Sequence, residues 1–224
     1  MSGSYTHVKT GFGDLDAIFE LEGIEQGSIV LVKSVPNANG LNFLLSIAQE
    51  NLEQVEYITT VHRPEKIKNS LESMGCIRSE IPEATFSGAE TDVEDFSALI
   101  ESLELTEGSV VIVDHIGMFG QMREQDHCKI LQLIDDIANQ TGSVFILHDL
   151  LTSSGGLSTY SSIEYGSDYV FNITKNLTDE GIFQNIWIER LPIGQSIKES
   201  KKSTRIVKVD DTLDRISTNA GGRI

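Results

Sequence analysis

Short apolar segments alternate with stretches of helical periodicity, and this alternation limits the possible folds more than any other feature of the chain. Strands are expected at residues 28–33, 55–60, 109–114 and 143–147, with a shorter candidate at 84–87. Helices are expected between them, at residues 40–53, 64–74, 93–103 and 126–139. Strands that are apolar on both faces and separated by helices build parallel sheets with helices on both sides. The sequence therefore predicts an α/β fold with a mainly parallel sheet flanked by helices.

The pattern changes after residue 165, where strand candidates follow one another without helices. They lie at residues 168–174, 183–191, 205–209 and 213–217, and residues 175–181 are expected to form a hairpin loop between the first two. Strands joined by short turns pair in an antiparallel manner, so we expect them to extend the same sheet. No linker rich in proline, glycine and serine divides the middle of the chain. Residues 1–217 are expected to form a single domain, followed by a flexible tail at 218–224.

Composition excludes several classes of protein. The 224 residues are 39% hydrophobic, which is enough for one globular core. No apolar run approaches the roughly 18 residues of a membrane span. Asp and Glu number 34 against 17 Lys and Arg, and the net charge of −17 repels nucleic acid and anionic membranes. The acids are scattered along the chain, which favours a solvation role, as in proteins from a high-salt cytoplasm. Cys76 and Cys128 lack metal or redox spacing, so a cytoplasmic protein with reduced cysteines is expected.

Residues 28–43 have the layout of a phosphate-binding loop without its phosphate chemistry. A buried strand runs into a short polar turn and an apolar helix begins near Gly40, which is the setting of the pattern G-x-x-x-x-G-K-[ST]. Gly40 keeps the second glycine of that pattern, whereas Val35 takes the place of the first. Leu41 stands at the lysine position, and Asn42 stands at the position of the Mg²⁺-binding serine or threonine. The layout predicts the scaffold of a nucleotide site without its main phosphate contact.

Further landmarks occur in a fixed order around this loop. They read T-G-F-G-D-L-D at residues 10–16, G-I-E-Q-G-S at 23–28, Y-I-T-T-V-H-R-P at 57–64, V-V-I-V-D at 110–114 and Y-S-S-I-E-Y-G-S-D at 160–168. Each motif is weak alone, but their order and spacing resemble the RecA-superfamily ATPase domain of the KaiC/RadA type, a group common in archaea. The resemblance covers about residues 8 to 210. It implies a RecA-like P-loop NTPase fold.

The departures from this family carry the functional information. The resemblance implies that an active member has lysine followed by serine or threonine where this chain has Leu41 and Asn42. It also implies paired glutamates after the second strand, one of which polarises the attacking water, and this chain has Val61 and His62 there. The strand-end acid that helps to hold Mg²⁺ is present as Asp114. Of these three features of an active member, the strand-end acid is kept, whereas the loop lysine and the paired glutamates are replaced.

The missing lysine limits nucleotide affinity. Its loss removes a charged hydrogen bond of roughly 1.5–3 kcal/mol, which corresponds to about 10–100-fold in affinity. Backbone groups of the turn and of the helix start could still contact phosphate. Lys33 ends the strand before the loop, but we expect it to point away from the position of Leu41. The vestigial site is expected to comprise Ser34, Pro36, Asn37, Asn39, Gly40 and Asn42.

No catalytic residue and no cofactor are expected, although weak binding of ATP and Mg²⁺ stays open. Asp114 is the metal candidate, and its alternative role is that of a cap or turn residue.

Three histidines follow predicted parallel strands. His62, His115 and His148 are each expected at a carboxyl end, and Asp114 and Asp149 stand next to two of them. Ligands of open α/β sheets bind at that edge. The set could hold Zn²⁺ or perform acid–base chemistry. Alternatively, the histidines are separate polar residues satisfied by loops, because no H-x-x-x-H or C-x-x-C spacing supports a metal.

Two functions remain open at this stage. The first is a non-hydrolysing RecA/KaiC-like protein that acts as a regulatory or scaffolding partner, through self-association or through pairing with an active RecA-family paralogue. The second is a weak ATPase of the KaiC/RadA group, in recombination, repair or signalling, with its lysine supplied from elsewhere. Nucleic acid is not an expected partner. The basic segment 198–205 has no interleaved aromatic residues, and the loop 152–159 has no basic residue. A membrane partner is not expected either.

Overall fold

A computed structural model describes most of the chain. The described residues are 7–16, 23–36, 38, 40–76, 81, 86–88, 93–117, 123–152, 161–178, 181–192, 205–209 and 216–217. Within them the strands form one nine-stranded sheet in the order β3-β2-β4-β5-β1-β6-β7-β8-β9. The tail predicted at 218–224 lies outside the described residues.

The first six strands in this order are parallel, which confirms the predicted sheet. They are β3 (Phe86–Gly88), β2 (Val55–Thr59), β4 (Val110–Val113), β5 (Val144–Leu150), β1 (Ile29–Ser34) and β6 (Tyr169–Thr178). The antiparallel extension is also confirmed, and it consists of β7 (Gly181–Arg190), β8 (Arg205–Val209) and β9 (Ile216–Ser217).

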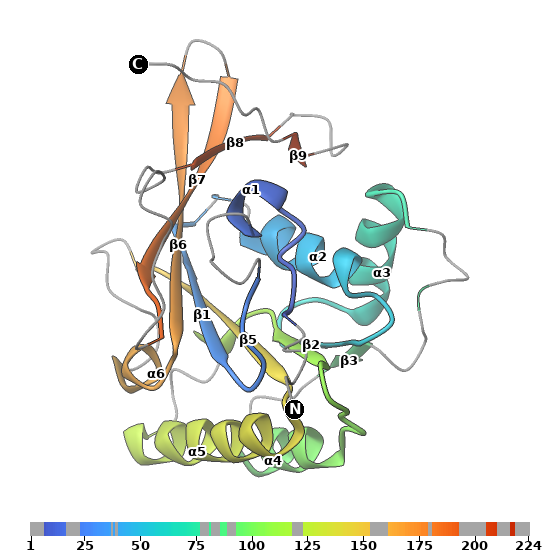
Figure 1. Ribbon diagram of the computed structural model, residues 1–224, viewed down its shortest axis with the longest axis vertical. Coiled ribbons are helices and arrows are strands. Elements are labelled where there is room, and N and C mark those ends of the chain that lie inside the picture. Colours follow the sequence, from blue (N-terminus) through green and yellow to red (C-terminus); the bar gives the residue numbers. More distant parts are fainter. Residues whose placement is uncertain are drawn as a thin grey trace, which may run out of the picture.

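Helices cover both faces of the sheet (Figure 1). They are α1 (Gly13–Asp16), α2 (Gly40–Glu50), α3 (Pro64–Ser73), α4 (Val93–Ser102), α5 (Glu124–Thr141) and α6 (Ser161–Tyr165). Strand alternation explains the two layers, because successive side chains of β1 point to opposite faces. Val30 and Val32 join the core under α2 and α3, whereas Ile29 and Leu31 join the core under α4 and α5. The central strands β1 and β4 are therefore buried on both faces along their whole length.

The hairpin loop predicted at residues 175–181 is wrong. The β6 strand continues to Thr178 and β7 begins at Gly181, with Lys175 paired to Gln184 and Thr178 paired to Gly181. The two strands are paired there through their backbones, and Lys175 is exposed. Polar residues that read as a loop are therefore part of a long two-stranded ribbon (Figure 1).

The motif at residues 10–16 packs against α2. The Asp16 carboxylate accepts hydrogen bonds from the backbone N–H and from the hydroxyl of Thr10, both at 2.8 Å. This closed turn presents Phe12, whose ring stacks on Phe43 of α2 with centroids 5.2 Å apart. The motif therefore has a packing role, next to the helix that follows the loop.

Parallel pairing brings the carboxyl ends of β2, β4, β5 and β1 to one edge of the sheet. Within the register, Ser34 lies beside Leu150 of β5 and Ile173 of β6. The helix α2 starts at this same edge, six residues after Ser34. In the part of the chain that the structure describes, no helix has the length and apolar character needed to cross a membrane.

Candidate functional site

The loop after β1 uses its own backbone donors. The N–H of Val35 donates to the carbonyl of Ile173 at 3.1 Å, and the N–H of Ala38 donates to the carbonyl of Val35 at 3.0 Å. Ala38 is buried in the core, and Val35 packs against the same cluster. Pro36 is exposed. A phosphate-binding loop needs free N–H groups directed at the ligand. The N–H groups of Val35 and Ala38 are instead hydrogen-bonded within the protein.

The predicted site residues on α2 lie in its first turn. Gly40 is buried, and Asn42 is half-buried. Leu41, at the lysine position, packs against the core with its partly buried side chain. Asn37 and Asn39, which were also predicted for the vestigial site, lie outside the described residues.

A buried serine–histidine pair lies directly next to Gly40. The Oγ of Ser34 is 2.7 Å from Nε2 of His148, and Nδ1 of His148 is 2.5 Å from the carbonyl oxygen of Asp114. A carbonyl only accepts, so Nδ1 carries the proton and Nε2 accepts from the serine hydroxyl. Burial lowers the pKa of His148, which favours this neutral form. The imidazole is thus held at both nitrogens.

Gly40 is a position where close approach requires glycine. A Cβ there would lie 2.6 Å from Nε2 of His148 and 2.6 Å from Oγ of Ser34. The first residue of α2 therefore sits in direct contact with the serine–histidine pair. Gly40, which matches the second glycine of the P-loop pattern, packs here against side chains of the same chain.

Asp114, the predicted metal candidate, is buried and hydrogen-bonded through both carboxylate oxygens. Oδ2 accepts from the hydroxyl of Thr59 at 2.6 Å, and Oδ1 accepts from the backbone N–H of Thr60 at 2.9 Å. These bonds tie the end of β4 to the end of β2. The sequence did not single out Thr59 and Thr60 as partners, although their place after a predicted neighbouring strand is the signal that could have identified them.

The three histidines do meet at this edge of the sheet. The rings of His115 and His148 have centroids 6.3 Å apart. Burial lowers the pKa of His115, while the nearby Asp149 and Asp114 act in the opposite direction and His62 adds to the lowering. Nδ1 of His115 is buried and has no hydrogen-bond partner among the described residues.

The structure does not support the predicted Zn²⁺ site at the three histidines. Among the residues that the structure describes, no group of three or more histidine, cysteine, aspartate and glutamate side chains could hold a metal ion. The Nδ1 of His62 lies 3.4 Å from the ammonium nitrogen of Lys66, which turns it towards an exposed cation.

The two positions that hold paired glutamates in the resembled family offer no carboxylate. Val61 has an exposed side chain, with 51% of its surface accessible. The N–H of His62 donates to Oγ1 of Thr59 at 2.9 Å, which closes the turn after β2. Neither side chain is a carboxylate that could polarise water.

Lys33 points away from the loop, as predicted. Its ammonium nitrogen lies 2.7 Å from a carboxylate oxygen of Glu189 and 3.4 Å from one of Glu164. Both partners lie on the face of the sheet opposite α2, because Lys33 alternates with Ser34 along β1. The lysine is buried and ion-paired, so it does not reach the position of Leu41.

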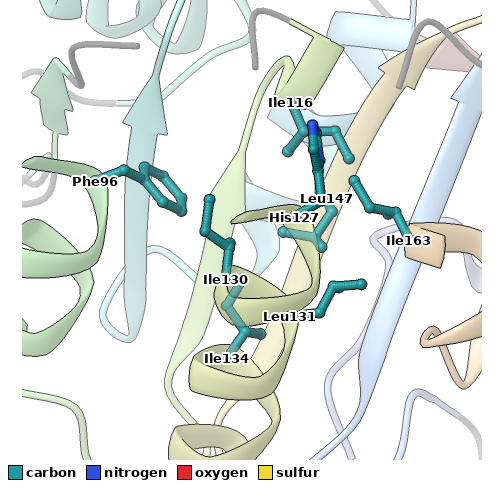
Figure 2. A pocket seen from close by; sticks show the side chains of 8 residues that line it. All are labelled: Phe96, Ile116, His127, Ile130, Leu131, Ile134, Leu147 and Ile163. Carbon is teal, nitrogen blue, oxygen red and sulfur yellow. The ribbon is translucent and has the colours of Figure 1, made fainter. Parts of the chain in front are cut away.

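A small hollow lies on the far side of the sheet from the loop. It is lined by side chains of α4, α5, α6 and β5 and by Ile116, which follows β4, and it has a volume of about 10 Å³. Figure 2 shows Phe96 on one side, Ile163 on the other and the side chains of α5 between them. The lining is apolar apart from His127. This volume is about that of one water and cannot hold a nucleotide.

The sheet order and the flanking helices give the chain a RecA-like α/β fold. The chain is similar to the KaiC-like protein PH0186 from the hyperthermophilic archaeon Pyrococcus horikoshii OT3, with a TM-score of 0.71 and 15% sequence identity. The match covers 92% of this chain and 96% of that chain. At this identity the likeness shows the fold alone. The chain belongs to a family of unknown function, DUF7125, whose model matches residues 7–215. No curated protein matches the chain.

Proposed function

We propose that this protein is a non-hydrolysing RecA/KaiC-like protein with a degenerate P-loop, acting as a regulatory or scaffolding partner. The strongest support is that groups of the loop bond to, or pack against, other groups of the same chain. The buried Ser34 and His148 side chains contact the first residue of α2, and the N–H groups of Val35 and Ala38 are bonded to carbonyls of the same chain. In the described part of the loop, these two N–H groups are satisfied without a phosphate.

The charges that phosphoryl transfer requires are also missing from the described part of the site. That reaction depends on neutralising phosphate charge and on a positioned water. Leu41 packs on the core in place of the lysine, and Val61 offers no base. Lys33 is not a substitute, because it is ion-paired to Glu164 and Glu189 on the opposite face.

A second candidate is a weak ATPase of the KaiC/RadA group. The observation in its favour is Asp114, which stands at the end of β4 with α2 starting nearby, in the position of a Mg²⁺-binding acid. Both its oxygens accept internal hydrogen bonds, so Mg²⁺ would have to compete with Thr59 and Thr60.

Calorimetric titration of the purified chain with Mg-ATP, together with a phosphate-release assay, separates the two candidates. We expect affinity in the millimolar range or none, and no phosphate release above background, at both low and high salt. Turnover with micromolar affinity that vanishes in Asp114→Ala would overturn the proposal. The matched control is Asp136→Ala, which removes an exposed acid of α5 far from the loop.

The proposed partner is a second copy of the chain or an active RecA-family paralogue, in the cytoplasm. The net charge of −17 disfavours nucleic acid and anionic membranes as partners. Light scattering after size exclusion, with the chain alone and mixed with the paralogue, is expected to show a mass above that of the monomer in one of the two samples. A monomer in both would remove support for a scaffolding role.

A further inference from the structure

We propose that the buried contact between Ser34 and His148, called the plug below, closes the vestigial loop against phosphate. This inference rests on the proposed function, because it concerns how the same loop does without nucleotide. It adds a second reason to expect weak nucleotide binding besides the missing lysine. That reason is a pair of side chains that lies beside the start of α2.

The plug joins three elements at one point. Ser34 ends β1, His148 lies near the end of β5, and Gly40 begins α2. The two strands are neighbours in the sheet, and the side chains of Ser34 and His148 lie on the same face as α2. Both polar atoms approach the ideal Cβ position of Gly40 to 2.6 Å, so no gap remains between the pair and the helix.

The polar groups of the plug also have their hydrogen-bond partners within the protein. The imidazole donates to the Asp114 carbonyl and accepts from the Ser34 hydroxyl, and the Ser34 carbonyl accepts from the N–H of Leu151 at 2.8 Å. Ser34 is 1% exposed and His148 is 5% exposed. An entering anion would have to break these buried hydrogen bonds, and unpaired buried polar groups are costly.

A phosphate at the start of a helix needs the space next to the first-turn N–H groups. The hydroxyl and the imidazole lie 2.6 Å from the ideal Cβ position of Gly40, the first residue of that turn. The imidazole is neutral and its Nε2 lone pair is already used, so it supplies none of the positive charge that Leu41 fails to supply. Restoring the lysine alone should therefore not restore the site.

The test restores the lysine with and without the plug. Leu41→Lys, Leu41→Lys with His148→Ala, and Leu41→Lys with His115→Ala are titrated with Mg-ATP and with pyrophosphate by calorimetry. We expect Leu41→Lys alone to bind less than about 3-fold more tightly than wild type. Removal of His148 should then add about 10-fold or more, the lower end of the range for a charged hydrogen bond. The His115→Ala control removes a neighbouring imidazole that does not contact Ser34, and should bind like Leu41→Lys alone.

Equal affinity of Leu41→Lys with and without His148 would overturn the plug while leaving the proposed function intact. Turnover by the wild-type chain would instead overturn the proposed function. Circular dichroism and thermal melting check that each variant folds. Where His148→Ala does not fold, His148→Asn keeps a donor for the Asp114 carbonyl and empties the space beside Gly40. If neither variant folds, the proposal also fails, because a plug must be removable from an otherwise ordered loop.

Discussion

At the scale of single residues, His148 makes stability depend on pH. Burial lowers its pKa in the folded protein, while an unfolded histidine titrates near its ordinary value of about 6.5. Below that value the unfolded chain binds a proton that the folded chain excludes, so the stability present above pH 6.5 is lost as the pH falls towards the folded pKa. Between pH 7.5 and 5.5 we therefore expect His148 to lower the free energy of unfolding, by no more than about 1.4 kcal/mol per pH unit, the limit for one proton. Urea unfolding at the two pH values measures this loss.

The variant His148→Asn isolates the contribution of this imidazole. Burial raises the pKa of Asp16 and of Asp168, so these carboxyl groups act in the opposite sense and gain stability as the pH falls. They are present in both proteins and cancel in the comparison. A pH slope that is the same in wild type and in His148→Asn would show that His148 is not held neutral in the fold.

The sequence was enough to recognise the altered phosphate-binding loop, but it did not predict the contact between Ser34 and His148. The replacement of lysine by Leu41 is visible once the strand, the turn and Gly40 are aligned with the P-loop pattern. The contact of Ser34 with His148 spans 114 positions and depends on the register between β1 and β5. A shift of one residue would move His148 to the other face, and local patterns do not specify that register.

At the scale of elements, Lys33 fastens β1 to α6 and β7. It is buried between Glu164 of α6 and Glu189 of β7, and Asn172 of β6 also hydrogen-bonds Glu189. Lys33→Met leaves the two carboxylates close together without their cation. We expect a loss of about 1–2 kcal/mol in the free energy of unfolding, less than for a fully buried pair because the carboxylates are partly solvated. Chemical denaturation followed by the fluorescence of Trp187, which lies on β7, measures the loss.

Lys175→Met is the matched control for this prediction. It removes an exposed lysine of the neighbouring strand β6 and should change stability by less than about 0.5 kcal/mol. If Lys33→Met were as stable as wild type, the ion pairs would not be what holds β7 and α6 to β1. Apolar packing of the same strands would then carry that role.

The elements differ in how well the sequence predicts them, for a physical reason. The parallel strands β1 and β4 are buried along their whole length, so the sequence shows them as clear and largely apolar runs. The ribbon at 175–181 and the short helices α1 and α6 lack such a signal. Helices of four and five residues contain too few turns for a periodic pattern.

At the scale of the whole molecule, the net charge should govern the response to salt. A charge of −17 repels itself, and the screening length falls from about 10 Å at 0.1 M salt to about 3 Å at 1 M. If the acidity is a solvation trait suited to high salt, as the scattered acids predict, the melting temperature should rise by several degrees between these concentrations. A variant with Glu101→Gln, Glu104→Gln and Asp136→Asn neutralises three exposed acids and should rise less. Because salt also strengthens apolar burial in both proteins, the difference between their slopes is the decisive quantity. Equal slopes would mean that surface repulsion does not limit stability, and the acidity would then need another explanation.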